Sequence, residues 1–370
     1  MEENVHMTIE QDTSEELLDR AIGALRGLLP PGWTVERGQG PAQDDGLADE
    51  RFFVKDRGGT GRPILLDARL RATPAELDKA YNDPLARRMR RDAGSPILVV
   101  SPYLSPRSRT VLEAANINYL DLTGNARIAI DYPGLSVLTE GAQREPTPRR
   151  RPDRGISGPA AGRIIRALTD FTPPYSVTHL AEIAGVSAGY CSRTLQALER
   201  EALLRRDNRG TVEEVDWPAM LRRRGNAVVL FDKGRTNTYI ARSGVQRTLE
   251  ALSNIEDQDY AITGSFAAAR IKAVTAPVGL AVYTTQPGAI SDALNLLPAD
   301  QGADVHLVRP ADRGVFDRSS VEDDVRWVGL SQVVLDCLGG TGRMPQEGEA
   351  VLEWMTENES AWRKAPEASS

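Results

Sequence analysis

Cysteine and histidine are scarce in this chain of 370 residues, which contains two cysteines and three histidines. Cys191 and Cys337 stand in distant parts of the sequence, so we expect neither a disulfide framework nor a cysteine-based zinc site. The histidines are equally scattered, which argues against a histidine-based metal site. The sequence therefore predicts no metal and no other cofactor, and its cysteine usage fits the reduced cytoplasm.

Long apolar runs are also missing, and none approaches the roughly 18 residues that a membrane-spanning helix needs. The first residues are acidic and polar, unlike a secretory signal peptide. A hydrophobic content of 41% is typical of a soluble globular protein, and the length allows two or three domains. We expect a cytoplasmic protein without a membrane partner. Lysine is rare beside arginine, which indicates a GC-rich genome rather than a special chemistry.

Charge is unevenly distributed. The chain carries a net charge of −7, yet residues 144–226 contain 15 arginines against 10 acidic residues. The arginines cluster at 149–151 and 154, at 205–209 and at 222–224. A basic module in an acidic protein is typical of specific DNA binding with little non-specific retention. The alternative is that the runs at 149–154 and 222–224 are only a solvated linker and a helix end.

The segment VTHLAEIAGVSAGYCSRTLQALEREALLRRDNRGTVEEV, residues 177–215, has the pattern of a winged helix-turn-helix. A short helix is predicted over 179–184, followed by a tight turn in which Val186 points inward and Ser187 caps the next helix. The second helix is predicted over 188–202. Residues 203–206 and 211–215 then form two strands around the turn at 207–210, which is the wing.

Helical periodicity divides the second helix into two faces. Cys191, Leu195, Leu198 and Ala202 fall on the face expected to pack inward. Arginine and glutamine on the other face suit base edges in the major groove, whereas tyrosine and wing arginines suit phosphates or the minor groove. We expect Arg193, Gln196 and Ser192 to read bases. The predicted DNA-binding residues are Ser187, Gly189, Tyr190, Ser192, Arg193, Gln196, Arg200, Arg205, Arg206 and Arg209. The alternative is a winged helix used only for protein contacts.

Two segments separate three predicted domains. Residues 141–158, GAQREPTPRRRPDRGISG, are rich in proline, glycine and arginine and cannot form a core element. A second boundary falls at 225/226, after a helix predicted over 217–224. The domains are therefore 14–140, the DNA-binding domain 159–225, and 226–362, which we expect to serve dimerisation or partner binding.

The N-terminal domain shows a helix, three strands and then a strand-helix-strand unit. The predicted helices are 14–29 and 106–115, and the predicted strands are 33–37, 51–55, 63–70, 97–101, 117–122 and 126–130. This order resembles the restriction-endonuclease-like, or PD-(D/E)xK, core over about residues 14–140. The resemblance rests on element order more than on motif identity.

That family cuts DNA with two acidic metal ligands and a lysine near the attacking water. In the corresponding strand, Asp67 matches the second acid, but Arg69 stands at the lysine position and cannot act as a base. Asp49, Glu50 or Asp56 would have to be the first acid, with Glu15 or Glu16 assisting. We expect a scaffold with no catalytic residues. The alternative is a magnesium-dependent nuclease of a defence system that uses Asp67, Arg69 and Asp56.

A second polar segment, YLDLTGNA at 119–126, places Asp121 and Asn125 on either side of a glycine turn. We expect both side chains to bond loop amides, which is a structural role.

The C-terminal domain is predicted to be an α+β domain. Strands are expected at 226–231 and 238–241, which pair, and at 260–265 and 278–283, with helices at 244–252 and 266–274. A strand that ends in Gly264-Ser265 at a helix start resembles nucleotidyltransferases. However, no Asp or Glu occurs between Tyr260 and Ser291 to hold magnesium, so any such site is degenerate. Helices at 327–338 and 347–358 flank a glycine-rich loop at 339–343, which is either a helix end with a turn or a phosphate loop.

Two further segments carry a second resemblance, YAITGSFAAARI at 260–271 and GLSQVVLDCLGGTGRMPQEGEAVLEWM at 329–355. Together with the winged helix they resemble AbiEi-type antitoxins of type IV toxin-antitoxin systems, and related transcription regulators, over about residues 156–360. The resemblance implies DNA binding by the winged helix and a C-terminal domain for self-association or a toxin partner. Those antitoxins usually begin with the winged helix, whereas a nuclease-like domain precedes it here.

The sequence therefore predicts an α/β multi-domain protein that regulates transcription. It is expected to bind double-stranded DNA sequence-specifically as a homodimer, since palindromic sites mirror protein symmetry. The alternatives are the nuclease described above and an antitoxin that binds a toxin.

Overall fold

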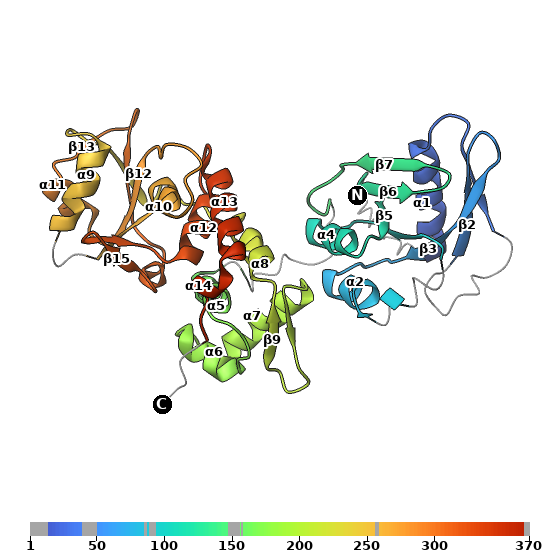
Figure 1. Ribbon diagram of the computed structural model, residues 1–370, viewed down its shortest axis with the longest axis horizontal. Helices are drawn as coiled ribbons and strands as arrows, with labels where there is room; N and C mark the ends of the chain where they lie inside the picture. Colours follow the sequence, from blue (N-terminus) through green and yellow to red (C-terminus); the bar gives the residue numbers. More distant parts are fainter. Residues whose placement is uncertain are drawn as a thin grey trace, which may run out of the picture. The chain divides into compact units, whose positions relative to one another are not determined.

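The structure is a computed structural model, and it describes residues 14–38, 50–84, 87–88, 94–146, 156, 158–255 and 259–365. The protein is a mixed α/β protein with two compact units (Figure 1). The first unit comprises residues 1–152 with 200–202, and the second comprises residues 153–199 with 203–370. No helix in the described ranges is long and apolar enough to cross a bilayer.

The first unit is built on one seven-stranded sheet whose strands follow each other in chain order, β1 to β7. Strands β3, β4 and β5 are parallel, and the other neighbouring strands are antiparallel. The described elements of this unit are α1 (Ser14–Leu28), β1 (Thr34–Arg37), β2 (Glu50–Lys55), β3 (Gly61–Ala68), α2 (Pro74–Tyr81), β4 (Ile97–Ser101), α4 (Pro106–Ala114), β5 (Asn118–Asp121), β6 (Ala126–Ile130) and β7 (Leu135–Thr139).

Helices cover both faces of this sheet. The alternation of side chains along β3 sends Leu66 into a core with α1 and Leu65 into a second core with α2 and α4. The parallel strands are apolar on both faces, as β4 shows with five consecutive buried residues, because parallel sheets are covered on both sides. Asp67, near the end of β3, therefore lies on the face of the sheet that α2 covers.

The second unit begins with three helices and a hairpin. Residues 159–225 form α5 (Pro159–Asp170), α6 (Val177–Ile183), α7 (Ala188–Arg200), β8 (Leu204–Arg206), β9 (Val212–Val215) and α8 (Trp217–Gly225). β8 and β9 pair with each other as an antiparallel hairpin, and Val212 of β9 also forms an antiparallel bridge with Tyr175, just before α6.

A second seven-stranded sheet follows, in the order β13-β10-β14-β12-β11-β16-β15. It is mixed, since β12 pairs in parallel with β14 and antiparallel with β11. Its strands are β10 (Thr236–Ile240), β11 (Tyr260–Thr263), β12 (Leu280–Thr284), β13 (Leu297–Pro298), β14 (Val305–Val308), β15 (Ser320–Glu322) and β16 (Val325–Trp327). The helices around it are α9 (Val245–Ala251), η2 (Leu252–Asn254), α10 (Gly264–Ile271), α11 (Pro287–Ala293), η3 (Arg313–Phe316), α12 (Leu330–Leu338), α13 (Met344–Glu357) and α14 (Glu359–Trp362).

One hydrophobic core runs through the whole second unit. It joins Leu168 of α5 and Leu195 of α7 to Val333 of α12 and Leu352 of α13, all of them buried. Helices α5 and α8 both pack against α12. The sequence predicts separate domains at 159–225 and 226–362, whereas in the structure the two segments share this core.

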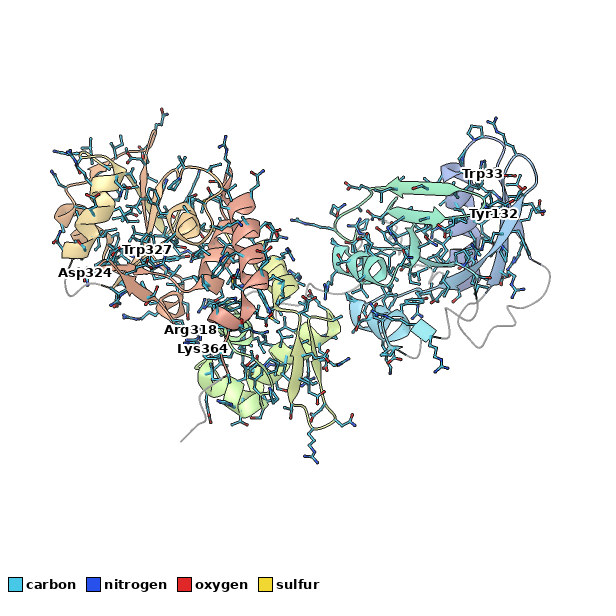
Figure 2. The ribbon with its side chains drawn as sticks, in the orientation of Figure 1. Trp33, Tyr132, Arg318, Asp324, Trp327 and Lys364 are labelled. Atoms are coloured by element: carbon cyan, nitrogen blue, oxygen red, sulfur yellow. The ribbon has the colours of Figure 1, made fainter. Side chains whose placement is uncertain are left out.

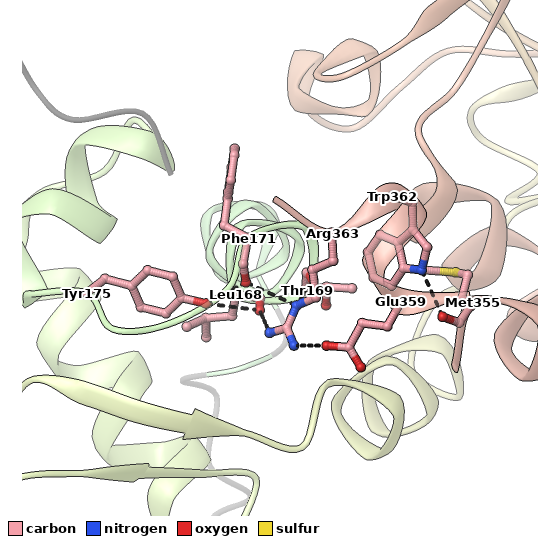
Figure 3. Close-up of polar contacts among 8 residues, drawn as sticks. All are labelled: Leu168, Thr169, Phe171, Tyr175, Met355, Glu359, Trp362 and Arg363. Carbon is pink, nitrogen blue, oxygen red and sulfur yellow. Dashed lines mark hydrogen bonds and ion pairs between the residues drawn. The ribbon is translucent and has the colours of Figure 1, made fainter. Parts of the chain in front are cut away.

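The end of the described chain returns to α5 and ties the two parts of this unit together (Figure 3). The Arg363 guanidinium donates to the Leu168, Thr169 and Phe171 carbonyls at 3.1, 2.8 and 3.1 Å, and to Glu359 at 2.6 Å. Since the last carbonyls of a helix have no partner within it, Arg363 caps the C-terminal end of α5. The Trp362 ring meets Trp217 of α8 edge-on, with centroids 5.1 Å apart.

The structure corrects two sequence predictions in the second unit. Residues 226–231 form turns, and β10 pairs instead with β13 and β14, because α8 extends to Gly225 and the chain needs those residues to reach the sheet. Trp327 lies on β16, parallel to β11, rather than at the start of a helix (Figure 2). Its ring is covered by the Arg270 guanidinium, 4.9 Å from the centroid.

Elements that were not predicted from the sequence include α2 and β7 in the first unit and α5, α11 and β14 in the second. Helix α2 carries a clear signal, because Thr73 caps it, Pro74 occupies its first turn and Glu76 bonds back to the Thr73 amide. Such a capping box is readable from TPAE alone.

Candidate nucleic-acid interface

The turn between α6 and α7 is built as the sequence predicts. Ser176 caps α6 by accepting from the His179 amide at 3.2 Å, and Ser187 caps α7 by accepting from the Tyr190 amide at 3.3 Å. Gly185 has a φ of +58°, a left-handed conformation that ends α6 at little cost for glycine. Val186 packs against the core, as expected.

The two faces of α7 are confirmed except at Ala202, because the helix ends at Arg200 and Ala202 follows it with a φ of +51°. Cys191, Leu195 and Leu198 are fully buried, and Thr194 and Ala197 are nearly so. Four predicted DNA-binding residues are exposed, namely Gly189, Arg193, Gln196 and Arg200, and Ser187 is exposed at the helix cap. Tyr190 and Ser192 are half-buried at the edges of this face. The helix thus presents a polar surface with two arginines and a glutamine.

Arg193 stands at the centre of this surface, one turn after Gly189. Its guanidinium carbon lies 5.9 Å from the centroid of the Tyr190 ring, a distance at which a cation and an aromatic face attract. Gly189 adds no side chain, and a Cβ built there meets Arg193 only at 3.8 Å. The first turn of α7 therefore lets a flat surface approach the backbone closely.

The three wing arginines differ from each other in the hairpin. Arg206 is bound to Glu199 of α7, with one of its contacts at 3.2 Å, and its side chain is only 16% exposed. Arg205 pairs with Glu214 across the hairpin, but both side chains are more than half exposed, and exposed ion pairs exchange easily. Arg209 is exposed at the turn, where Asp207 holds the Arg209 and Thr211 amides at 2.8 Å. Arg209 is thus best placed for a phosphate.

Two arginines after the wing have structural roles. Arg222 forms a fork with the Glu349 carboxylate of α13 at 2.8–3.0 Å. Arg224 donates to the Ile156 and Gly158 carbonyls at 3.1 and 3.3 Å and so fixes the chain before α5. Arg223 is exposed. Arg149, Arg150, Arg151 and Arg154, also predicted to lie near DNA, fall outside the described residues.

In the first unit, two neighbouring side chains bind the Asp67 carboxylate. Its Oδ2 accepts from Arg69 at 2.8 Å and from the Tyr81 hydroxyl, and the residue is 8% exposed. Burial, together with the neighbouring Asp67 charge, raises the pKa of Tyr81 well above its ordinary value, so Tyr81 remains a donor. Arg69 therefore neutralises the carboxylate that a nuclease would use to hold a metal.

Of the first-acid candidates that the structure describes, neither Asp56 nor Glu50 lies beside Asp67. Asp56 lies in the β2–β3 turn, where its Oδ1 accepts from the Gly58 and Thr60 amides at 2.9 Å. Asp67 lies at the other end of β3, roughly 20 Å away for a strand of this length. Glu50 is paired in register with Leu66, so it shares the α1 face, opposite Asp67. Asp49 lies outside the described residues.

Acidic, cysteine and histidine side chains do not gather elsewhere either, since the described residues contain no group of three that could hold a metal ion. Asp121 and Asn125 have the structural role expected of them. The two Asp121 oxygens accept from the Thr123, Asn125 and Leu104 amides at 2.9, 3.1 and 3.0 Å. Asn125 in turn accepts from the Gly141 amide at 2.9 Å.

The Gly264-Ser265 start of α10 is packed against α13 and β12. A Cβ built on Gly264 meets the Met344 side chain at 3.0 Å and Ala281 at 3.4 Å. The Ser265 hydroxyl donates to the buried Glu347 of α13 at 2.6 Å. The glycine-rich loop at 339–343 connects α12 to α13, with Gly339 as the C-cap of α12, so it is a helix end and a turn.

A buried polar cluster in the second unit was not predicted from the sequence. Asp336 of α12 is fully buried and accepts from Thr263 at 2.6 Å, Tyr283 at 2.9 Å and Gln332 at 2.8 Å. Gln332 in turn accepts from Arg166 of α5 at 2.7 Å. The signal was present, because Gln332 and Asp336 are polar residues four apart in a largely apolar helix.

Comparisons with known proteins give no relative. No protein-family model matches the chain, no curated protein is significantly similar to it, and no solved structure matches it.

Proposed function

We propose that this protein is a transcription regulator that binds double-stranded DNA sequence-specifically through a winged helix-turn-helix formed by α5 to β9. The observation that carries the proposal is the exposed face of α7, where Arg193, Gln196 and Arg200 project from a helix whose other face is buried. Arginine and glutamine are the side chains that recognise guanine and adenine edges. The hairpin after α7 exposes Arg209 at its tip, as a wing that contacts phosphate would.

The proposal extends to the rest of the molecule. The resemblance to AbiEi-type antitoxins favours a cytoplasmic homodimer in which the C-terminal part of the second unit mediates self-association or binds a toxin. The first unit is proposed as a restriction-endonuclease-like scaffold without catalysis. Support comes from Asp67, which is engaged by Arg69 and Tyr81 and has no acidic neighbour among the candidates that the structure describes.

The test is a binding titration against the duplex upstream of the protein's own gene and an unrelated duplex of equal length, at one fixed salt concentration. Tight binding to the first alone supports the regulator. Equal binding to both duplexes contradicts it, and no binding to either shifts the weight to a protein-interaction role such as an antitoxin.

Substitution of Arg193 identifies the reading helix. Arg193→Ala is expected to cost about 1–3 kcal/mol of binding free energy, confined to one base position, if it forms a bidentate guanine contact. Arg247→Ala, an exposed arginine on α9, is the matched control and is expected to bind like the wild type. Footprints of the bound duplex show whether a two-fold site is covered, as a homodimer requires.

The same duplexes incubated with magnesium test the first unit. We expect them to stay intact with the wild type. Cleavage that is abolished in Asp67→Ala would make the protein a nuclease instead.

A further inference from the structure

A cavity lies inside the second unit, between α5 and the second sheet. Its volume is about 220 Å³, room for about seven water molecules at their liquid volume. Apolar side chains make up one part of its lining, and arginine, aspartate, tyrosine and glutamine side chains make up the other. The apolar part, called the apolar wall below, includes Val228, Val229, Leu230, Val308, Val315 and Leu335. A pocket with apolar walls and a few converging polar groups is typical of small-molecule sites.

The polar wall is dominated by Arg166, which projects from α5. The residue is only 6% exposed. Its Nη1 donates to Gln332, but its Nε and Nη2 have no hydrogen-bond partner among the described residues. The nearest ion-pair partner is Asp317, whose Oδ2 lies 3.9 Å from Nη2. Nε and Nη2 are closed off from solvent, so a ligand in the cavity does not reach them. The guanidinium is nevertheless short of counter-charge, since its ion-pair partner Asp317 lies 3.9 Å away, and an anion bound in the cavity would supply that charge.

Two more arginines line the same cavity. Arg224 reaches it from the end of α8, and Arg235 from the start of the second sheet, where its partner Asp232 lies 3.4 Å away. The acidic lining residues are already engaged. Asp312 pairs with Arg163 at 3.6 Å, and Asp336 accepts three hydrogen bonds. The lining thus contains three arginines against two aspartates.

The geometry points to a binding site for a compact organic anion, with its carboxylate or phosphate group at Arg166 and a short hydrocarbon part against the apolar wall. Guanidinium groups match both oxyanions in geometry. Among the elements around the cavity, α5 connects the cavity to the helix-turn-helix, because it also packs against α6 and shares the core with α7. Occupancy of the cavity is therefore proposed to change DNA affinity, a regulatory role that rests on the proposed function.

Binding is tested first without DNA, using the full chain. Inorganic phosphate, succinate and butyrate are titrated by calorimetry, with thermal unfolding as a second readout. We expect millimolar or tighter binding of at least one probe, and the pattern tells a phosphate from a carboxylate ligand. Saturating binding of none of the three at millimolar concentration overturns the site.

Variants locate the ligand. Arg166→Lys keeps the charge but loses the fork, and Arg235→Gln changes a half-exposed side chain, so a folding defect is not expected in the second. Each is expected to weaken binding about tenfold or more. Arg247→Gln, remote from the cavity lining, is the matched control and keeps wild-type affinity. Wild-type affinity in both Arg235→Gln and Arg166→Lys would place the anion elsewhere and overturn the assignment.

The regulatory step is then measured as the change in affinity for the upstream duplex when the anion is added. We expect a change of several-fold in the wild type and none in Arg235→Gln. Anion binding with unchanged DNA affinity overturns the regulation but keeps the site. If the protein binds the anion but does not bind the upstream duplex, the proposed function is refuted and the anion site is kept.

Discussion

Arg193 and Arg209 are both exposed, but they occupy different settings. Arg193 projects from a helix that a packed core holds in a fixed position. Its guanidinium therefore has a defined direction, which the proposed contact with a base requires. Arg209 lies in a hairpin turn whose amides are held by Asp207. A phosphate contact tolerates such a position, because it needs charge more than direction.

Arg209→Ala is therefore expected to weaken binding to all duplexes by a similar factor and to reduce the salt dependence of the affinity by about one unit of slope. Titrations at several salt concentrations measure this slope. A loss confined to one base position would instead show that the wing reads sequence.

Asp336 is the buried acid whose titration should be measurable. Burial raises the pKa of Asp336 from 3.8 to about 6, although Thr263, Tyr283, Gln332 and Arg166 favour its charged form. Because the folded state then holds a proton that the unfolded chain has released, the free energy of unfolding falls as pH rises from about 4 to about 6. Above that window the contribution is constant. The loss amounts to up to about 3 kcal/mol.

Asp336→Asn removes this titration, so the difference in stability between wild type and variant should change across the same window and be flat above it. Denaturant unfolding followed by tryptophan fluorescence at several pH values measures it. Trp217, Trp327, Trp354 and Trp362 all report on the second unit. Parallel profiles for the two proteins would show that Asp336 does not titrate in this range.

At the scale of elements, the α6–α7 turn depends on one glycine and the α7 surface on another. Gly185 has a positive φ with open space around it, whereas Gly189 lies in the first turn of a helix. Alanine at 185 is strained by its backbone and should cost about 1 kcal/mol of stability. Alanine at 189 should increase stability by up to about 1 kcal/mol through helix propensity.

For Gly189→Ala, the expected change in DNA affinity is opposite in direction to the expected change in stability. Under the proposed function, Gly189→Ala should weaken DNA binding despite its greater stability, because the added Cβ would hinder a DNA backbone from approaching the first turn of α7. Thermal unfolding and duplex titrations on both variants separate the two effects. Unchanged affinity in Gly189→Ala would mean that the N-terminal turn of α7 does not approach the DNA closely.

Most helices and strands follow from the sequence because their local signals are strong. The 3.6-residue repeat in 188–200, the serine at 187 and the glycine at 185 together define α7 and its turn. Residues 226–231 were predicted wrongly as a strand because an apolar run of that length fits several structures. The strand expected to pair with them, β10, instead pairs with β13 and β14, which lie far along the chain.

The whole molecule is two units, and the second has a core of its own. We therefore expect residues 153–370, expressed alone, to bind the upstream duplex with the affinity and selectivity of the full chain. The segment must extend through Arg363, since that side chain caps α5. Circular dichroism establishes that the fragment is folded. A folded fragment that has lost selectivity would show that the first unit takes part in DNA recognition.

The candidate DNA-binding surface could be predicted from the sequence in greater part than the cavity. The exposure of Arg193, Gln196 and Arg200 follows from the period of a single helix. The internal partners of Arg206, Arg222 and Arg224 do not, because Glu199, Glu349 and the carbonyls before α5 are set by packing. The cavity joins residues from α5, α8, α12 and the second sheet, which no local pattern relates.

By itself, the sequence determined the mixed α/β class, the helix-turn-helix with its hairpin, and the absence of a lysine beside Asp67, since each depends on residue types and short-range spacing. Only the tertiary structure decided that Asp67 is neutralised by Arg69 and Tyr81, that Asp56 and Glu50 lie away from it, and that α5 shares a core with the second sheet. Those outcomes depend on which distant segments pair, and pairing is chosen by burial of the whole apolar surface rather than by any local preference.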